Sequence, residues 1–346
     1  MSARLFLRLA PAMLCLSAPA HGQGAAAPAS VPAAVPGQAA TRAEAGAGVG
    51  FEQARMGDGT EIGIWFPAYG AAKPQRLGLY AQQAITGAAP AGRRLPLIVM
   101  SHGNGGHFAG HSDTAAALAR AGFVVASLTH PGDNWRDQSR ATQMNGRVTA
   151  LTALITHMLE SWQHHAVLDP QRVGAFGFSA GGFTVLAAAG GRPDLARMGR
   201  HCADHPGFFD CGVVKAHPLP DPAWTARPDR RIKAVVAAAP ALGFTFGRTG
   251  LSRVTMPVQL WRADNDPVLP APFYADAVRA DLPRRPEFHA VPGAGHFDFL
   301  APCDAGGALA RICATEGFDR GAFHARFNAE VVRFFRRHLA RAQRPG

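Results

Sequence analysis

Apolar residues along the chain fall into short runs rich in valine, isoleucine and alanine. The run Leu97–Ser101 reads Leu-Ile-Val-Met-Ser and is followed by a glycine-rich stretch. Continuous apolar runs of this length are typical of strands that are buried on both faces of a parallel sheet. The runs predict strands over Glu61–Phe66, Leu97–Ser101, Phe123–Leu128, Arg172–Phe178, Ile232–Ala239, Val258–Trp261 and Glu287–Val291.

Between these runs, apolar positions repeat with the period of a helix. Val148, Leu151, Ile155 and Leu159 lie on one face of such a segment. Alternating strands and helices predict an α/β fold with a mostly parallel sheet and helices on both of its faces. Ligands of such sheets bind at the carboxyl ends of the strands. The pattern predicts helices over Ser112–Ala121, Arg147–Trp162, Ala180–Ala189, Pro270–Leu282 and Phe323–Leu339.

Two stretches break this alternation. Residues 190–230 are rich in Pro, His, Asp and Phe, and we interpret them as a small inserted lid over the pocket. Residues 1–20 combine Arg4 and Arg8 with an apolar run and end in Ala18-Pro19-Ala20, which predicts a signal peptide and export to the periplasm or medium. Residues 21–50 are mostly Ala, Pro and Gly, which predicts a disordered tether before a domain spanning 51–346.

The composition is globular, with 47% hydrophobic and 17% charged residues among 346, and a formal net charge of +11. The arginines that carry this charge are scattered and form no block of five or six. A scattered charge gives no footprint for nucleic acid. The apolar run at the N-terminus is too short and too interrupted to span a bilayer. We therefore expect no nucleic-acid partner and no stable membrane insertion, and the oligomeric state stays open.

The sequence Gly177-Phe178-Ser179-Ala180-Gly181 has the G-x-S-x-G pattern of a nucleophile elbow. It follows a predicted strand and opens a predicted helix, which is the context in which this motif places a reactive serine. The start of a helix carries partial positive charge and favours a developing anion. The motif predicts Ser179 as the nucleophile.

A serine needs a base and an acid, which follow it in the order acid, then histidine, in folds with this elbow. His296 lies in Pro-Gly-Ala-Gly-His, directly after the last predicted strand, and is better placed than His289 or His338. The loop after Val258–Trp261 holds Asp264 and Asp266. We prefer Asp266, beside a proline where the turn ends, and Asp264 remains the alternative.

The oxyanion of the intermediate needs backbone N–H donors. We assign one to Ala180, next to the serine, and one to Asn104 in the glycine-rich loop after Leu97–Ser101. This loop matches no phosphate-binding pattern. Four further residues are candidates for lining the substrate pocket, namely His102, His130, Trp135 and Phe178.

Five cysteines are present, and cleavage of a signal peptide would remove Cys15. An even number of cysteines in an exported chain indicates disulfides. Sequence proximity makes Cys202–Cys211 and Cys303–Cys313 the simplest pairs, although four cysteines allow three connectivities. Zinc binding near His201 and His205 is the rival interpretation, and no ligand spacing supports it.

These motifs together resemble exported bacterial hydrolases described as predicted dienelactone hydrolases, which are similar to platelet-activating-factor acetylhydrolases. The resemblance runs from Phe51 over most of the chain, and it implies an α/β-hydrolase fold, a Ser179-Asp266-His296 triad and no metal or organic cofactor. True dienelactone hydrolases use a cysteine nucleophile, so the serine here separates the chain from that substrate class. The stretches that carry the resemblance are Ser101–Gly106, His130–Trp135, Gly177–Gly182, Asp264–Pro270 and His296–Cys313.

The resulting hypothesis is a serine hydrolase that cleaves small carboxylic esters through an acyl-enzyme, as carboxylic-ester hydrolases do. An amidase or lactonase could use the same triad. A non-catalytic binding protein on a hydrolase scaffold is an alternative from a different class, because this fold hosts many functions. The natural substrate and its acyl and alcohol groups are not encoded in any motif that we recognise.

Overall fold

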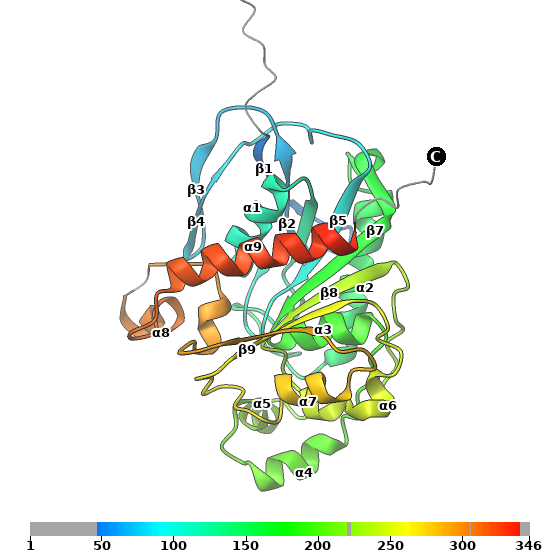
Figure 1. Cartoon of the computed structure of the whole chain (residues 1–346), viewed down its shortest axis with the longest axis vertical. Helices are drawn as coiled ribbons and strands as arrows, with labels where there is room; N and C mark the ends of the chain where they lie inside the picture. Colours follow the sequence, from blue (N-terminus) through cyan, green and yellow to red (C-terminus); the bar gives the residue numbers. More distant parts are fainter. Residues whose placement is uncertain (1–46, 220–222, 305, 340–346) are drawn as a thin grey trace, which may run out of the picture. The chain divides into compact units, whose positions relative to one another are not determined.

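The computed structural model describes residues 47–219, 223–304 and 306–339, and these fall within one compact unit, Ala45–Gly346. Its centre is an eight-stranded sheet with the strand order β1-β2-β6-β5-β7-β8-β9-β10 (Figure 1). The strands of this sheet are β1 (Gly48–Arg55), β2 (Glu61–Ala68), β5 (Leu95–Ser101), β6 (Val124–Leu128), β7 (Leu168–Phe178), β8 (Ile232–Ala238), β9 (Val258–Ala263) and β10 (Glu287–Val291).

The sheet is mostly parallel, as the apolar runs predict. β2 pairs antiparallel with both β1 and β6, whereas β5 through β10 pair in parallel with their neighbours. Because parallel strands end at the same edge, the loops after β5, β7, β9 and β10 converge there. Every site residue predicted from sequence lies in or next to a loop at this edge or in the adjoining loop after β6.

Helices cover both faces of the sheet (Figure 1). On one face α2 and α3 pack together, and on the other α1 packs against the long α9. Each face has its own buried cluster of apolar residues, so the sheet separates two hydrophobic cores. The helices are α1 (Ser112–Arg120), α2 (Met144–Glu160), α3 (Ala180–Ala188), α4 (Arg197–Asp204), α5 (Phe209–Ala216), α6 (Gly247–Leu251), α7 (Ala275–Asp281), α8 (Ala310–Cys313) and α9 (Arg320–His338).

Three details differ from the sequence-based expectations. β1 begins at Gly48, so the last residues of the predicted tether 21–50 belong to the sheet, where Gly50 pairs with Phe66 of β2. The helix predicted over Pro270–Leu282 is shorter, α7, because Pro270 and Pro272 have no N–H to donate. A small two-stranded sheet, β3 (Lys73–Leu77) with β4 (Tyr80–Ala84), was not expected.

The predicted signal peptide and most of the predicted tether lie outside the described residues, so both remain predictions. Among the residues that the structure does describe, no helix is long and apolar enough to cross a bilayer. The segment 190–230 contains α4 and α5, which lie at the lower end of the view in Figure 1, beyond the edge where the site loops meet.

Candidate active site

Ser179 stands at a sharp turn between β7 and α3. Its backbone has φ +56° and ψ −121°, a left-handed conformation that is costly for a residue with a side chain. The flanking glycines are needed because the turn is tight. A Cβ on Gly177 would lie 2.1 Å from the carbonyl oxygen of Gly181, and one on Gly181 would lie 1.9 Å from that of Ser101.

The structure brings the three predicted triad residues together. His296 Nε2 lies 3.0 Å from Ser179 Oγ, and His296 Nδ1 lies 2.7 Å from Asp266 Oδ2. All three side chains are buried. These distances are within the hydrogen-bond reach that a nucleophile and its base require. The residues lie far apart along the chain, since the numbers of Ser179 and His296 differ by 117.

The carboxylate of Asp266 is held on both oxygens. Oδ1 accepts hydrogen bonds from the N–H groups of Val268 and Leu269, each at 2.8 Å, while Oδ2 faces His296. Burial alone would raise the pKa of Asp266, but the adjacent imidazole of His296, hydrogen-bonded to Oδ2, and these N–H groups lower it below its ordinary value. Asp264 instead pairs with Arg262 at 2.8 Å, so the acid facing His296 is Asp266.

Asn104 and Ala180 line the same cavity as Ser179. Ala180 is the first residue of α3, so its N–H has no acceptor within the helix. The Asn104 side chain donates to Asp133 Oδ1 at 2.7 Å, which ties this residue to the loop after β6. Gly103 beside it packs so closely that an added Cβ would lie 3.2 Å from Ser179 Cβ. The two residues that are predicted to supply the N–H donors therefore line the cavity that contains Ser179.

Comparisons with known structures agree with this fold. The ferulic acid esterase from Streptomyces cinnamoneus has a similar structure, with a TM-score of 0.58 at 17% identity over 89% of this chain and 94% of that one. The chain has the α/β-hydrolase fold. This confirms the fold that the sequence motifs indicated.

Two sequence comparisons match parts of this chain. The family model for the prolyl oligopeptidase family, Peptidase_S9, matches residues 109–213. A putative esterase, NocK, from Nocardia uniformis subsp. tsuyamanensis is 30% identical over 144 residues, which cover 41% of this chain. The matched region spans 38% of that relative. The narrower resemblance to exported dienelactone hydrolases remains a prediction.

Of the predicted pocket residues, Phe178 lies closest to the three triad residues, with its ring centroid 4.8 Å from that of His296. His102 and His130 are buried and bonded to the protein itself. His102 Nε2 accepts from the His130 N–H at 2.9 Å, and His130 Nε2 lies 2.7 Å from Ser101 Oγ. Burial lowers the pKa of both imidazoles well below the ordinary value. His130 therefore supports the loop and does not line the pocket, contrary to the prediction.

Two cavities meet at Asn104. The first is small, holds Ser179 and Ala180, and is lined by apolar side chains of the 190–230 segment, among them Leu195, Met198 and Val213. The second is a larger groove, lined by the glycine-rich loop, Phe178 and the exposed Trp135 among others. Arg136 lies over the Trp135 ring at 4.4 Å from its centroid. Trp135 thus borders the site at the groove, and His102 lines the groove as well.

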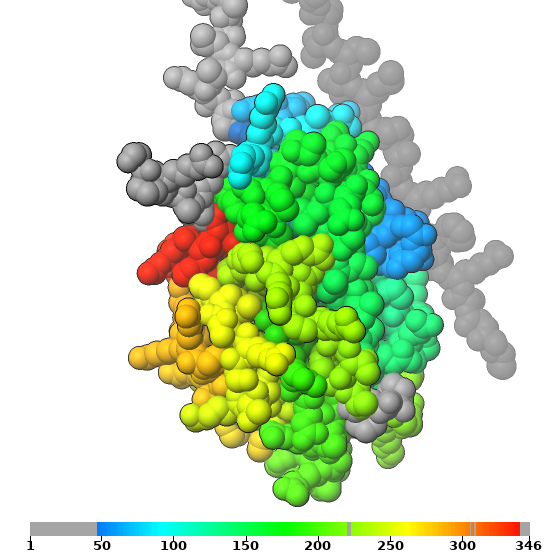
Figure 2. Space-filling model, turned by 90° about the vertical axis from the view of Figure 1, so that its right-hand side faces the viewer, coloured from blue at the N-terminus to red at the C-terminus, as the bar shows by residue number. Residues whose placement is uncertain are grey.

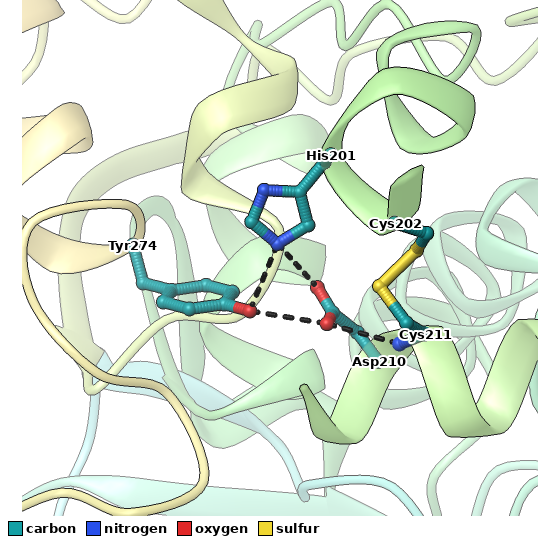
Figure 3. Close-up of a disulfide and its surroundings, with 5 residues drawn as sticks. All are labelled: His201, Cys202, Asp210, Cys211 and Tyr274. Atoms are coloured by element: carbon teal, nitrogen blue, oxygen red, sulfur yellow. Dashed lines mark hydrogen bonds and ion pairs between the residues drawn. A yellow bond between two sulfur atoms is a disulfide. The ribbon is translucent and has the colours of Figure 1, made fainter. Parts of the chain in front are cut away.

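The 190–230 segment, called the lid below, borders the first cavity, and its role as a lid remains a prediction. Figure 2 shows the green and yellow-green segments around residues 150–230 packed against the yellow segments that follow, without a gap between them on this face. A polar triangle fixes the lid to the loop before α7 (Figure 3). Tyr274 Oη donates to Asp210 Oδ1 at 3.0 Å, and His201 Nε2 lies 3.3 Å from Tyr274 Oη.

The structure contains the two disulfides that sequence proximity favoured, Cys202–Cys211 and Cys303–Cys313. The first joins α4 to α5 beside the polar triangle (Figure 3). Zinc binding by His201 with Cys211 would require a free thiolate, and the sulfur of Cys211 is bonded to Cys202. The donor set therefore does not fit zinc.

Sequence reasoning missed Asp133 and Arg147 as parts of the site. Both are buried, and Arg147 donates a hydrogen bond to Asp133 Oδ2 beneath the glycine-rich loop. Arg147 stands directly before Val148 in a helix whose periodic apolar face points inward. The sequence signal that could have identified Arg147 is a charged residue at the edge of an apolar helix face. Arginine is almost never fully buried unless it is paired, so this position indicates a buried partner.

Proposed function

We propose that this chain is a serine esterase, which hydrolyses carboxylic esters with Ser179, His296 and Asp266 through an acyl-enzyme. The observation that carries the proposal is the line of contacts from Ser179 Oγ to His296 Nε2 at 3.0 Å, and from His296 Nδ1 to Asp266 at 2.7 Å. The names of NocK and of the Streptomyces esterase support the same class of reaction.

The contacts define the steps. His296 Nε2 takes the proton of Ser179 as Oγ bonds to the ester carbonyl carbon, and Asp266 stabilises the imidazolium. The N–H groups of Asn104 and Ala180 hold the oxyanion. When the intermediate collapses, His296 returns the proton to the alcohol oxygen, which leaves. Water then attacks the acyl-enzyme with His296 again as base, releasing the acid and restoring Ser179.

We assign the acyl group and the alcohol group of the substrate to different cavities. His296 must reach the oxygen of the leaving alcohol, so the alcohol lies on the histidine side of Ser179. Phe178 and Phe297, whose rings lie 4.8 and 5.4 Å from that of His296, both line the larger groove. The groove therefore receives the alcohol, and the apolar cavity under the lid receives the acyl group. A medium apolar acyl chain joined to a larger alcohol fits this division.

The decisive test is Ser179→Ala, assayed with p-nitrophenyl butyrate. We expect kcat/KM to fall by about four orders of magnitude or more, because loss of the nucleophile removes the covalent step. Ser252→Ala, an exposed serine beside α6, is the matched control and should keep full activity. Labelling by a fluorophosphonate should disappear in Ser179→Ala alone. Undiminished hydrolysis by folded, purified Ser179→Ala protein would refute the proposal, and an unlabelled wild-type chain would favour a binding protein.

Amide hydrolysis is a second candidate function, and the match of residues 109–213 to the prolyl oligopeptidase family favours it. The same triad attacks esters and amides, and the two differ in the leaving group that His296 must protonate. Matched p-nitrophenyl esters, p-nitroanilides and lactones, compared by kcat/KM, separate the esterase from the amidase and the lactonase. A higher kcat/KM for the anilide than for the ester would replace our proposal with the amidase.

We also propose that the chain is exported. The two disulfides fit an oxidising compartment, because cytosolic thiols are kept reduced. The predicted signal peptide would provide the route. Expression of the full chain with the natural N-terminus should release a shortened protein into the periplasm or medium, with no thiol that reacts under denaturing, non-reducing conditions. Retention of the intact N-terminus in the cytosol would contradict export.

A further inference from the structure

A buried ion pair lies directly beneath the loop that carries Asn104. The side chains of Arg147 and Asp133 are only 2% and 1% exposed. Arg147, on α2, donates from one terminal nitrogen to Asp133 Oδ2. Its other terminal nitrogen donates to the carbonyl oxygen of His102. The guanidinium therefore holds both the loop after β5 and the loop after β6.

The second oxygen of Asp133 also binds the Asn104 loop. Oδ1 accepts from Asn104 Nδ2 at 2.7 Å and from the N–H of Gly105 at 2.9 Å. The ion pair thus contacts the loop at three residues, through the carbonyl of His102, the side chain of Asn104 and the N–H of Gly105. The position of the Asn104 backbone is fixed from both sides.

The same guanidinium reaches the other half of the oxyanion site. Arg147 Nε donates to Thr184 Oγ1 at 3.1 Å, and Thr184 Oγ1 donates to the carbonyl oxygen of Ala180 at 2.7 Å. Ala180 supplies the second predicted N–H. One side chain therefore connects the two backbone segments whose separation determines whether both donors reach a single oxygen.

Stability alone does not account for this pair. Removing two charges from water carries a desolvation penalty that often offsets their attraction, so buried ion pairs are weak contributors to stability. Burial lowers the pKa of Arg147, whereas the adjacent Asp133 carboxylate acts in the opposite direction and favours the charged guanidinium. Fixed hydrogen-bond donors are valuable in catalysis because they need no reorganisation when charge develops.

We propose that Asp133 and Arg147 are positioning residues, which set the spacing between the Asn104 and Ala180 N–H groups that bind the oxyanion; this inference rests on the proposed function. Neither side chain touches the reacting atoms. Both act through the backbone of the two donors. Their loss should therefore weaken binding of the transition state and leave binding of the ground state nearly unchanged.

The test compares Asp133→Asn and Arg147→Lys with wild type in the full chain. We expect kcat for p-nitrophenyl butyrate to fall about 10- to 100-fold, the loss that a misplacement near 1 Å produces, with KM changed less than 3-fold. Inhibition by 1,1,1-trifluoro-2-pentanone, which Ser179 converts into an oxyanion adduct, should weaken by the same factor as kcat/KM. Arg147→Lys, which keeps the charge, should lose less than Arg147→Met.

The chain offers a matched control in Asp229→Asn. Asp229 is also a buried carboxylate paired with an arginine, Arg231, which reaches α2 through Thr156, and it lines neither cavity of the site. Its loss should lower stability and leave kcat intact. If the ion-pair variants do not fold, Asn104→Ala is the alternative, because it removes one of the three contacts, the hydrogen bond from the Asn104 side chain to Asp133. It should lower kcat about 5- to 10-fold on the same reasoning.

Folded Asp133 or Arg147 variants with kcat within 3-fold of wild type would overturn the inference. A loss of kcat without a parallel loss of ketone affinity would do so too. Both results are distinguishable from failure of the proposed function, in which wild type itself would show no hydrolysis that depends on Ser179.

Discussion

Two disulfide-closed segments border the site, one on each side of Ser179, and they differ in what they enclose. The lid carries Cys202–Cys211, and the 303–313 loop carries Cys303–Cys313, with sequence separations of 9 and 10. The lid lines the small apolar cavity with Leu195, Met198 and Val213. The 303–313 loop contributes Leu309 and Ile312 to the rim of the larger groove.

The two segments are also anchored differently. Arg320 holds the 303–313 loop, donating to the Ile312 carbonyl at 2.6 Å while it pairs with the buried Asp298 at 2.9 Å. The lid is held by the triangle of His201, Asp210 and Tyr274. The anchor of the lid thus contains a histidine, the residue type whose charge changes near neutral pH, whereas the 303–313 loop is held by an arginine and an aspartate.

Removing each disulfide is expected to have the largest effect. Loops of about 10 residues should each contribute about 2.7 kcal/mol to the free energy of unfolding in the chain-entropy model. Because the two loops are nearly equal in length, the double variants Cys202→Ser/Cys211→Ser and Cys303→Ser/Cys313→Ser should lose similar stability in urea unfolding. Their activities should diverge, the first variant losing preference among acyl chains and the second among alcohols. Identical substrate profiles would break the comparison.

Filling each cavity is expected to have an intermediate effect. Val213→Trp should lower kcat/KM for p-nitrophenyl hexanoate about 10- to 100-fold relative to acetate, on the scale by which pockets discriminate methylene groups. Leu309→Trp, at the half-exposed groove rim, should leave that hexanoate-to-acetate ratio within 3-fold. It should instead alter the ranking of butyrate esters with different alcohols. The reverse pattern would exchange the acyl and alcohol sides.

Acidification should give the smallest effect, confined to the lid. Burial lowers the pKa of His201, so the closed lid favours the neutral imidazole, and this stability is present above about pH 6.5 and is lost as pH falls below it. Burial raises the pKa of Asp210, so protonation of this carboxylate at lower pH stabilises the closed lid and opposes the effect of His201. The groups that also face or influence this pair are His205, Asp204 and Tyr274.

From pH 7 to 5, hydrogen exchange corrected for its intrinsic rate should therefore accelerate in α4 and α5. The free energy of opening should fall by at most about 1.4 kcal/mol per pH unit. Exchange in α8 should stay constant. His201→Gln should flatten the dependence, and an equal acid response in both segments would contradict the distinction between their anchors.

The sequence predicted the triad because its members follow strands that end at one edge of the sheet. The Gly-x-Ser-x-Gly elbow and the glycine-flanked His296 are local patterns, and the parallel sheet converts them into neighbours. The choice between Asp264 and Asp266 rests on short-range contacts that no sequence motif marks. It depends on Arg262 binding the first carboxylate, and on the N–H groups of Val268 and Leu269 holding the second.

The rest could not be predicted, because its partners are distant in the sequence and carry no motif. Arg147 reaches His102 from 45 positions away, and Tyr274 reaches Asp210 from 64. The helix α4, with the sequence Arg-Met-Gly-Arg-His-Cys-Ala-Asp, buries only Met198 and His201. Two buried positions give too little periodicity to indicate a helix from apolar pattern alone.

The backbone of Ser179 has a broader consequence. A left-handed conformation costs a residue with a Cβ roughly 1 kcal/mol or more, and glycine adopts it freely. The position of the proposed nucleophile is thus also one whose backbone conformation lowers the stability of the fold. We expect Ser179→Gly to be more stable than wild type and inactive. The difference in the free energy of unfolding between Ser179→Gly and Ser179→Ala would measure how much stability is lost by placing a side chain at this turn.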